Sequence, residues 1–192
     1  MNEIETHPFE PFLPPHAVLL MLGSFPPQPR RWKMDFYYPN FTNDMWRIFG
    51  VIFFGDKTHF IISEKNIFDK EKLIRFLHEK GIALFDTARA IRRLKDNASD
   101  KFLEIVQSTD IPALLTRIPQ CRTIVTTGEK ATETVRTQIK VISPKVGTSE
   151  PFLLDNRSMR LYRMPSSSRA YPMNVEKKAA IYRKMFEELK LV

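Results

Sequence analysis

The chain has 192 residues, of which 43% are hydrophobic, and 30 Lys and Arg against 22 Asp and Glu give it a formal net charge of +8. This length fits one domain with a substantial core, so we expect residues 1–192 to form a single domain. The charge suits a polyanionic partner, because Lys and Arg displace counterions from phosphates, but charge alone does not establish one.

Several protein classes are excluded or disfavoured. Cys121 is the only cysteine, which rules out an intramolecular disulfide and suits a reducing compartment. The four histidines lack metal-ligand spacing, so we expect no zinc site. No run approaches the roughly 20 apolar residues of a membrane span, and the acidic, proline-rich N-terminus does not resemble a secretory signal. We therefore expect a cytoplasmic protein that binds no membrane.

The elements alternate along the chain. Repeated prolines predict an extended lead-in over residues 1–15. Short apolar runs predict strands at 17–22, 82–86 and 123–127, and a more alternating one at 160–164. Helical periodicity predicts helices between them, at 44–52, 69–80, 99–106, 111–118, 129–138 and 175–191.

This alternation predicts an α/β fold, a three-layer α/β/α sandwich with a mainly parallel four-stranded central sheet. Ligands of such sheets bind at the carboxyl ends of the strands. The loops 23–43, 86–100 and 165–172 all follow predicted strands, so we expect them to share one site.

The long loop after the first strand combines cations with aromatic rings. Loops of about this length in a compact domain are usually functional. Any one ring could simply cover the edge of the core, but the cluster as a whole is typical of a nucleic-acid surface. Its members are Arg30, Arg31, Trp32, Lys33, Phe36, Tyr37 and Tyr38.

Two polar residues in these loops have alternative roles. Asn43 precedes a predicted helix and is either its N-cap or, if Thr42 caps instead, an amide that faces the pocket. Asp86 ends the second strand and is either a water-activating base or a cap of the following turn, the latter being favoured. Asp86 is followed by four cations, Arg89, Arg92, Arg93 and Lys95. A helix bearing them would either border the site expected at the strand ends or form a solvated face.

Residues 22–27 and 37–46 resemble the uracil-DNA glycosylase superfamily, nearest its mismatch-specific and hypoxanthine-DNA glycosylase branches. Those branches carry a Gly-x-x-Pro loop and then an aromatic, His-Pro-x-Asn-x-Phe-Trp segment. Asn43 and Trp46 match the Asn and Trp of that segment, and Tyr38 falls on the aromatic that stacks on the flipped base. Asn40 and Phe41 replace the His-Pro.

Further motifs follow in the order that the family has them, so the resemblance covers about residues 19–172. Residues 83–86 are similar to its Leu-Trp-Asp strand end, and Arg93 to Asp100 resembles its Arg…Ser-x-Asp stretch. Residues 126–131 resemble its Asn-Gly-x-x-Ala turn, and 164–168 match its Leu-Pro-Ser-x-Ser motif. One departure is Phe25, which replaces the Asn that the mismatch-specific branch has in its first loop. The hypoxanthine branch also lacks that Asn and relies on the Asn of the later segment, which Asn43 matches.

The resemblance implies a site without metal or cofactor, in a protein that we expect to be monomeric. Catalysis is expected at Asn43, helped by the backbone amides of Ser24 and Phe25. The expected base-binding residues are Gly23, Pro26, Tyr38 and Ser166, and the expected DNA-binding residues are Arg93, Ser167, Ser168, Arg169 and Tyr171.

The expected function is that of a DNA glycosylase, which hydrolyses the N-glycosidic bond of a deaminated or mismatched base, uracil or hypoxanthine, in base-excision repair. One alternative is a catalytically degenerate relative that binds DNA without cutting, which Phe25 favours. The other is a small-molecule α/β enzyme that binds a phosphate in the first loop. Gly23 argues against the latter, because it stands alone, without the Gly-x-Gly-x-x-Gly or Gly-Lys-Ser pattern.

Overall fold

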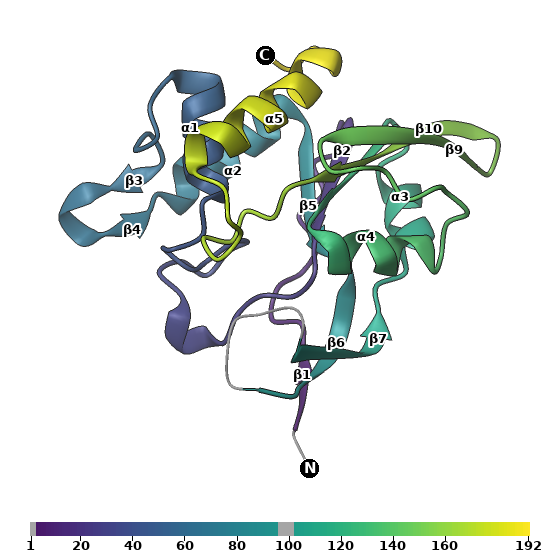
Figure 1. Cartoon of the computed structure of the whole chain (residues 1–192), viewed down its shortest axis with the longest axis horizontal. Helices are drawn as coiled ribbons and strands as arrows, with labels where there is room; N and C mark the ends of the chain where they lie inside the picture. Colours follow the sequence, from purple (N-terminus) through teal and green to yellow (C-terminus); the bar gives the residue numbers. More distant parts are fainter. Residues whose placement is uncertain (1–2, 96–101) are drawn as a thin grey trace.

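The computed structural model describes residues 3–95 and 102–192. Its central sheet has five strands in the order β5–β2–β8–β10–β9 (Figure 1). Four of them run parallel, and β9 pairs antiparallel with β10 at the edge. Their bounds are β2 Leu19–Gly23, β5 Ile82–Asp86, β8 Thr123–Thr127, β9 Thr148–Leu154 and β10 Arg157–Met164.

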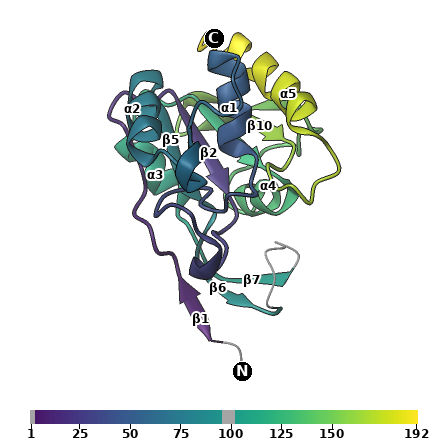
Figure 2. The same ribbon diagram turned by 90° about the vertical axis from the view of Figure 1, so that its left-hand side faces the viewer.

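The predicted α/β sandwich is confirmed. Every residue of β2, β5 and β8 is buried, as expected for strands covered on both faces. Helices α1, α2 and α5 lie on one side of the sheet and α3 and α4 on the other, and Figure 2 turns the first three toward the viewer. Their bounds are α1 Met45–Phe54, α2 Lys70–Lys80, α3 Ile111–Arg117, α4 Glu129–Arg136 and α5 Val175–Glu188.

The prediction of four strands was wrong, because β9 is a fifth. All of its side chains are exposed or half-buried except that of Phe152, which is buried. It also contains Pro151, which is tolerated in sheets on edge strands, where a missing backbone donor is not needed. No apolar run therefore marked this strand in the sequence.

Local capping fixes where the helices begin. The side chains of Asp69, Asp110 and Asn174 accept hydrogen bonds from backbone N–H groups in the first turns of α2, α3 and α5. Helix α2 ends at Gly81, whose φ of 64° is a left-handed conformation that glycine adopts without strain.

A second, antiparallel sheet corrects two predictions. It consists of β1 Ile4–Thr6, β6 Ala88–Arg93 and β7 Leu103–Ser108 in the order β1–β6–β7. The cations that were assigned to a loop or helix after Asp86 therefore lie on and after strand β6, and residues of the predicted helix at 99–106 belong to β7. Strand β6 alternates buried and half-buried side chains around a bulge, which obscured its period of two.

The N-terminal segment packs against both sheets. Strand β1 pairs with β6, and Phe12 forms an isolated bridge with Leu84 of β5. A two-stranded ribbon, β3 Ile61–Ile62 and β4 Ile67–Phe68, lies between α1 and α2 in the chain, and short 3₁₀ turns occur at η1 Pro29–Arg31 and η2 Ser63–Lys65. None of the helices in residues 3–95 and 102–192 is long and apolar enough to cross a bilayer.

Candidate active site

A pocket of about 250 Å³ opens where the parallel strands end. Gly23, Asp86 and Thr127 are the last residues of β2, β5 and β8, and Ser166 follows the end of β10. This is the edge at which parallel sheets bind ligands. The volume is below the roughly 300–1,000 Å³ of pockets for drug-sized molecules, and it suits a group the size of one nucleobase.

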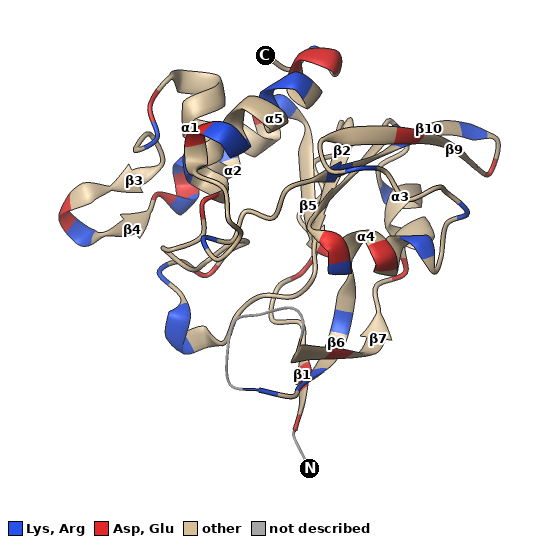
Figure 3. Ribbon diagram, viewed as in Figure 1, with Lys and Arg blue, Asp and Glu red and all other residues tan. Residues whose placement is uncertain are grey.

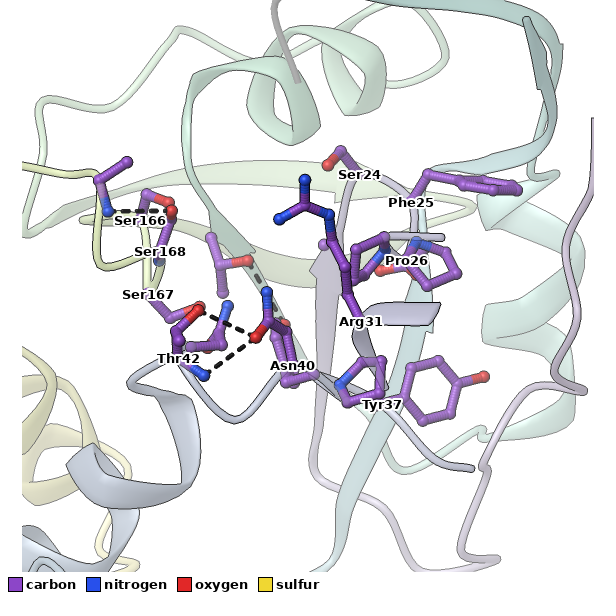
Figure 4. Close-up of a pocket in the computed structure, with 18 of the residues that line it drawn as sticks. Ser24, Phe25, Pro26, Arg31, Tyr37, Asn40, Thr42, Ser166, Ser167 and Ser168 are labelled. Atoms are coloured by element: carbon purple, nitrogen blue, oxygen red, sulfur yellow. Dashed lines mark hydrogen bonds between the residues drawn. The ribbon is translucent and has the colours of Figure 1, made fainter. Parts of the chain in front are cut away.

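The structure brings almost all predicted site residues together (Figure 4). The pocket is lined by Gly23, Ser24, Phe25, Pro26, Tyr38, Asn43, Arg93, Ser166, Ser167, Ser168 and Arg169. Tyr171 is the exception, because it lines a neighbouring hollow on the other side of Arg169. Ser99 and Asp100, which belong to the family-like stretch, lie outside the described residues.

Gly23, Asp86 and Tyr38 form one wall of the pocket. A Cβ atom at position 23 would clash with Asp86 Oδ1 and lie 3.7 Å from the Tyr38 hydroxyl, so a larger residue there would have to displace the Asp86 carboxylate. Tyr38 has a φ of 51°, which is uncommon for a bulky residue and is held by its surroundings. Its ring meets Trp46 edge-on at 5.7 Å, and its hydroxyl lies 3.4 Å from Thr127 Oγ1.

The first loop contributes backbone donors. The Phe25 ring packs with Ala88, Ile91 and Leu103, and Figure 4 shows it turned away from the serines of the 165–172 loop. The N–H groups of Ser24 and Phe25 have no acceptor within the described part of the chain, although the Ser24 carbonyl accepts from Ala88 N. Two donors are therefore available where the pocket wall follows β2.

Asn43 has two functional groups with different surroundings. Its Oδ1 accepts a hydrogen bond of 2.9 Å from Met45 N at the start of α1, but the N-cap position belongs to Asp44, whose side chain makes no capping bond. Thr42 does not cap the helix either, because the Thr42 N–H and hydroxyl both donate to Asn40 Oδ1. No described residue accepts from Asn43 Nδ2, which leaves a side-chain donor for the pocket.

The 165–172 loop is fixed from several sides. Ser166 Oγ accepts from Ser168 N at 3.2 Å, a bond drawn in Figure 4, and Ser167 O accepts from Asp44 N at 2.9 Å. Lys178 Nζ of α5 donates to Ser168 O at 2.7 Å and lies 2.9 Å from Asp44 Oδ2. The loop is thereby tied to the beginnings of α1 and α5 and presents its serines in one arrangement.

A buried His7–Asp86 pair was missed in the sequence. His7 Nε2 lies 3.0 Å from Asp86 Oδ2, and the two side chains are 1% and 9% exposed. Asp86 thus bonds to the N-terminal segment and does not cap the turn after β5, as had been favoured. Its Oδ1 has no hydrogen-bond partner among the described residues. The pair spans 79 residues, and no local pattern could have revealed it.

His7 and Glu5 of the N-terminal segment do not line the pocket, but they hold two residues that do, Asp86 and Arg93. His7 Nδ1 lies 2.9 Å from Phe9 O and 3.1 Å from Phe9 N, which holds the ring in place. Glu5 accepts two hydrogen bonds of 2.9 Å from Arg93, which also donates to Pro26 O. A bidentate contact of this kind fixes the orientation of a guanidinium.

Arg31 is a second residue whose role the sequence did not single out. It lines the pocket, and its Nε is buried without an acceptor in the described chain. Figure 4 shows the side chain extending toward Ser24. Figure 3 places Lys and Arg at η1, within the first loop, and along β6.

Other groups at the pocket are poor candidates for proton transfer or metal binding. Burial raises the pKa of the Tyr37 hydroxyl far above its usual value, and that hydroxyl donates to Glu10 O at 2.7 Å. The described residues contain no group of three or more His, Cys, Asp or Glu side chains placed to hold a metal ion.

The comparisons with known proteins support the fold assignment. The sequence matches no protein-family model and no curated protein. The structure is similar to the solution NMR structure of a candidate uracil DNA glycosylase from Methanosarcina acetivorans, with a TM-score of 0.59 and 23% sequence identity. The similarity covers 95% of this chain and 99% of that one. The chain therefore has the fold of that protein, an α/β domain with a mixed, mostly parallel five-stranded sheet flanked by helices.

Proposed function

We propose that this protein is a DNA glycosylase that hydrolyses the N-glycosidic bond of a deaminated or mismatched base, uracil or hypoxanthine. The supporting observation is the convergence of Tyr38, Asn43 and Ser166 on one base-sized pocket at the ends of the parallel strands. The fold shared with the Methanosarcina acetivorans protein is consistent with this function.

The substrate would have to leave the DNA stack. Everting a base costs a few kcal/mol, and the cost is smaller for a damaged or mismatched base. Tyr38 would stack on the everted base, and the hydroxyls and amides of Ser166 to Ser168 would bind adjacent phosphates. Arg169, an exposed side chain at the pocket rim, would contact the backbone or fill the vacated space.

Asp86 would select the base. With Oδ2 held by His7, Oδ1 is an acceptor fixed at the pocket wall. Uracil and hypoxanthine both carry a ring N–H on the Watson–Crick edge, whereas cytosine and adenine carry a lone pair there. A carboxylate placed opposite that ring nitrogen therefore accepts a hydrogen bond from the deaminated bases but faces a lone pair in their parents, and opposing two lone pairs costs free energy.

Bond cleavage would rely on charge stabilisation. The C1′–N bond breaks with its electron pair leaving on the base, the oxygen of a water molecule bonds to C1′, and that water releases a proton to solvent. The departing base later takes up a proton from solvent. The Ser24 and Phe25 N–H groups, Asn43 Nδ2 and the Arg31 guanidinium are donors suited to the negative charge that develops on the base.

A panel of oligonucleotides tests the proposal. Each carries uracil, hypoxanthine, xanthine or a mismatched thymine at one position, with cytosine and adenine as controls, in single and double strands. Abasic sites should form with at least one deaminated or mismatched base and with neither control. Absence of abasic sites across the whole panel would refute the glycosylase function.

A DNA-binding relative without excision activity is the second candidate. One observation favours it: Phe25 packs into an apolar cluster, so the first loop has no side-chain amide or carboxylate at that position. Salt-dependent binding to the same oligonucleotides without abasic sites would identify this function instead.

A further inference from the structure

A second hollow lies beside the pocket and has no role in the chemistry above. We call it the side hollow; it measures about 730 Å³ and lies between the start of α1, the β3–β4 ribbon and the start of α5. Arg169 lines both the side hollow and the pocket, so the two are adjacent. The lining residues used below are Asp44, Arg47, Lys57, Arg169, Tyr171 and Glu176.

The side hollow carries an excess of positive charge. With Lys178, which pairs with Asp44 from beneath, four cations stand against the two carboxylates of Asp44 and Glu176. Asp44 Oδ2 lies 2.9 Å from Lys178 Nζ, whereas Asp44 Oδ1 is 3.7 Å from Arg169 Nε. Arg169 is therefore only loosely compensated by the nearest carboxylate.

Arg47 is held in position with unused donors. Its Nη1 donates to Phe41 O at 2.7 Å and to Asn43 O at 3.0 Å, and its guanidinium lies 4.6 Å from the centre of the Phe41 ring. No hydrogen bond joins its Nε or Nη2 to another described residue. Arg47 and Arg169 line the same hollow, where their like charges repel; burial, and then the charge of Arg169, lower the pKa of Arg47. An anion between them would relieve that repulsion.

Tyr171 adds an aromatic surface to the same hollow. It is half-buried, and its backbone N–H donates to Ser168 O at 3.1 Å, so the ring is carried by the same fixed loop as the phosphate-binding serines. A guanidinium pair next to an aromatic ring is the combination with which proteins bind the phosphate and base of single-stranded nucleic acid.

We propose that the side hollow binds the nucleotide adjacent to the everted one, in the same strand. Its phosphate lies between Arg47 and Arg169, and its base stacks on Tyr171. The proposal rests on the proposed function, since it takes the occupant of the pocket to be a nucleotide of DNA. It assigns Arg47, which the motif resemblance did not include, to phosphate binding.

Binding to a single-stranded oligonucleotide with one tetrahydrofuran abasic analogue tests this without any cleavage. Arg47→Gln should weaken binding about tenfold, as expected for the loss of one hydrogen bond to a charged group. The slope of log affinity against log salt should fall by about 0.7. Lys184→Gln removes an exposed cation that lines neither cavity and is the matched control.

A methylphosphonate scan locates the phosphate. Neutralising one phosphate next to the analogue should weaken binding of the wild type about tenfold and have no further effect on Arg47→Gln. The assignment would be overturned if the methylphosphonate weakened binding of Arg47→Gln as much as it weakens binding of the wild type. It would also be overturned if Arg47→Gln kept the salt slope of the wild type.

Tyr171 gives an independent readout, because Arg47→Gln also disturbs the carbonyls of Phe41 and Asn43. Tyr171→Ala should weaken binding about tenfold and Tyr171→Phe should not, since stacking needs only the ring. Equal affinity of the wild type and Tyr171→Ala would overturn the stacking role, and equal binding of a polyglutamate peptide would show that no nucleotide is recognised.

The outcomes separate this inference from the glycosylase proposal. A wild type that binds the oligonucleotide but excises no base refutes the glycosylase proposal and leaves the side hollow assigned. A wild type that excises a base while its Arg47 and Tyr171 variants bind as tightly refutes the side hollow alone.

Discussion

Lys178 Nζ lies 2.9 Å from Asp44 Oδ2, and these two side chains are 0% and 4% exposed. The pair joins α5 to the start of α1, and Lys178 also donates to Ser168 O at 2.7 Å. Two loops that approach the pocket from distant parts of the chain, 23–43 and 165–172, are thereby held by one buried ammonium group.

Removing one member of this pair should destabilise the fold. Lys178→Met leaves the Asp44 carboxylate buried without its partner, which typically costs about 3–5 kcal/mol. Urea denaturation should show this loss in the free energy of unfolding. The double variant Asp44→Asn/Lys178→Met should be more stable than Lys178→Met, because it buries no unpaired charge; a double variant as unstable as the single one would contradict the expectation.

Asn43→Ala should abolish excision while leaving DNA binding nearly intact. Because Asn43 Oδ1 accepts from Met45 N, this variant should also lose about 1 kcal/mol of stability. Asn43→Asp is a second test, since it keeps the acceptor and replaces the Nδ2 donor with a negatively charged oxygen. Excision rates and affinities for the same oligonucleotide check both variants, and unchanged turnover in either would remove Asn43 Nδ2 from the mechanism.

His7 should act on excision through Asp86. Asp86→Leu should lower kcat/KM roughly tenfold to a hundredfold, the effect of one lost buried hydrogen bond to a charged group. His7→Leu should lower it about tenfold, and His7→Gln, which retains a donor, should recover most of that loss.

The double variant His7→Leu/Asp86→Leu separates positioning from general destabilisation. It should excise no more slowly than Asp86→Leu alone, because His7 has no carboxylate left to orient. Independent, multiplicative losses would show that His7 supports only the fold. Melting temperatures of all variants control for unfolding.

Arg31→Gln should slow bond cleavage by about a hundredfold, comparable to removing one donor from an oxyanion site. The loss should be smaller with 5-fluorouracil than with uracil, because the more acidic leaving group needs less stabilisation. Lys33→Gln, an exposed cation of the same loop outside the pocket lining, is the control. A loss that is equal for both bases would assign Arg31 to binding instead.

Cys121 should behave as an inert structural thiol. Burial raises its pKa to about 11, so almost no thiolate exists near pH 8, and labelling by a disulfide reagent should require unfolding. In the unfolded chain the thiol pKa is about 8.5. Its contribution to stability is therefore complete below that pH and falls as the pH rises toward 11. Rapid labelling of the native protein at pH 8 would show that the site is open.

The sequence by itself determined the central architecture. Strands β2, β5 and β8 are buried on both faces, so their apolar runs were unambiguous, and the capped amphipathic helices between them imposed a parallel order. That order predicted that the loops after these strands share one site, whereas the individual site residues were named from the resemblance of the motifs.

The tertiary structure decided the rest. Strand β9 carries Pro151 and an exposed surface, and β6 is interrupted by a bulge, so neither has the periodicity that marks a strand. The partners of the site's two buried acids, His7 for Asp86 and Lys178 for Asp44, are 79 and 134 residues away. Local preferences cannot specify such contacts. The two groups of each pair meet only when the chain folds, and burial of a charged group is favourable only where a partner lies beside it.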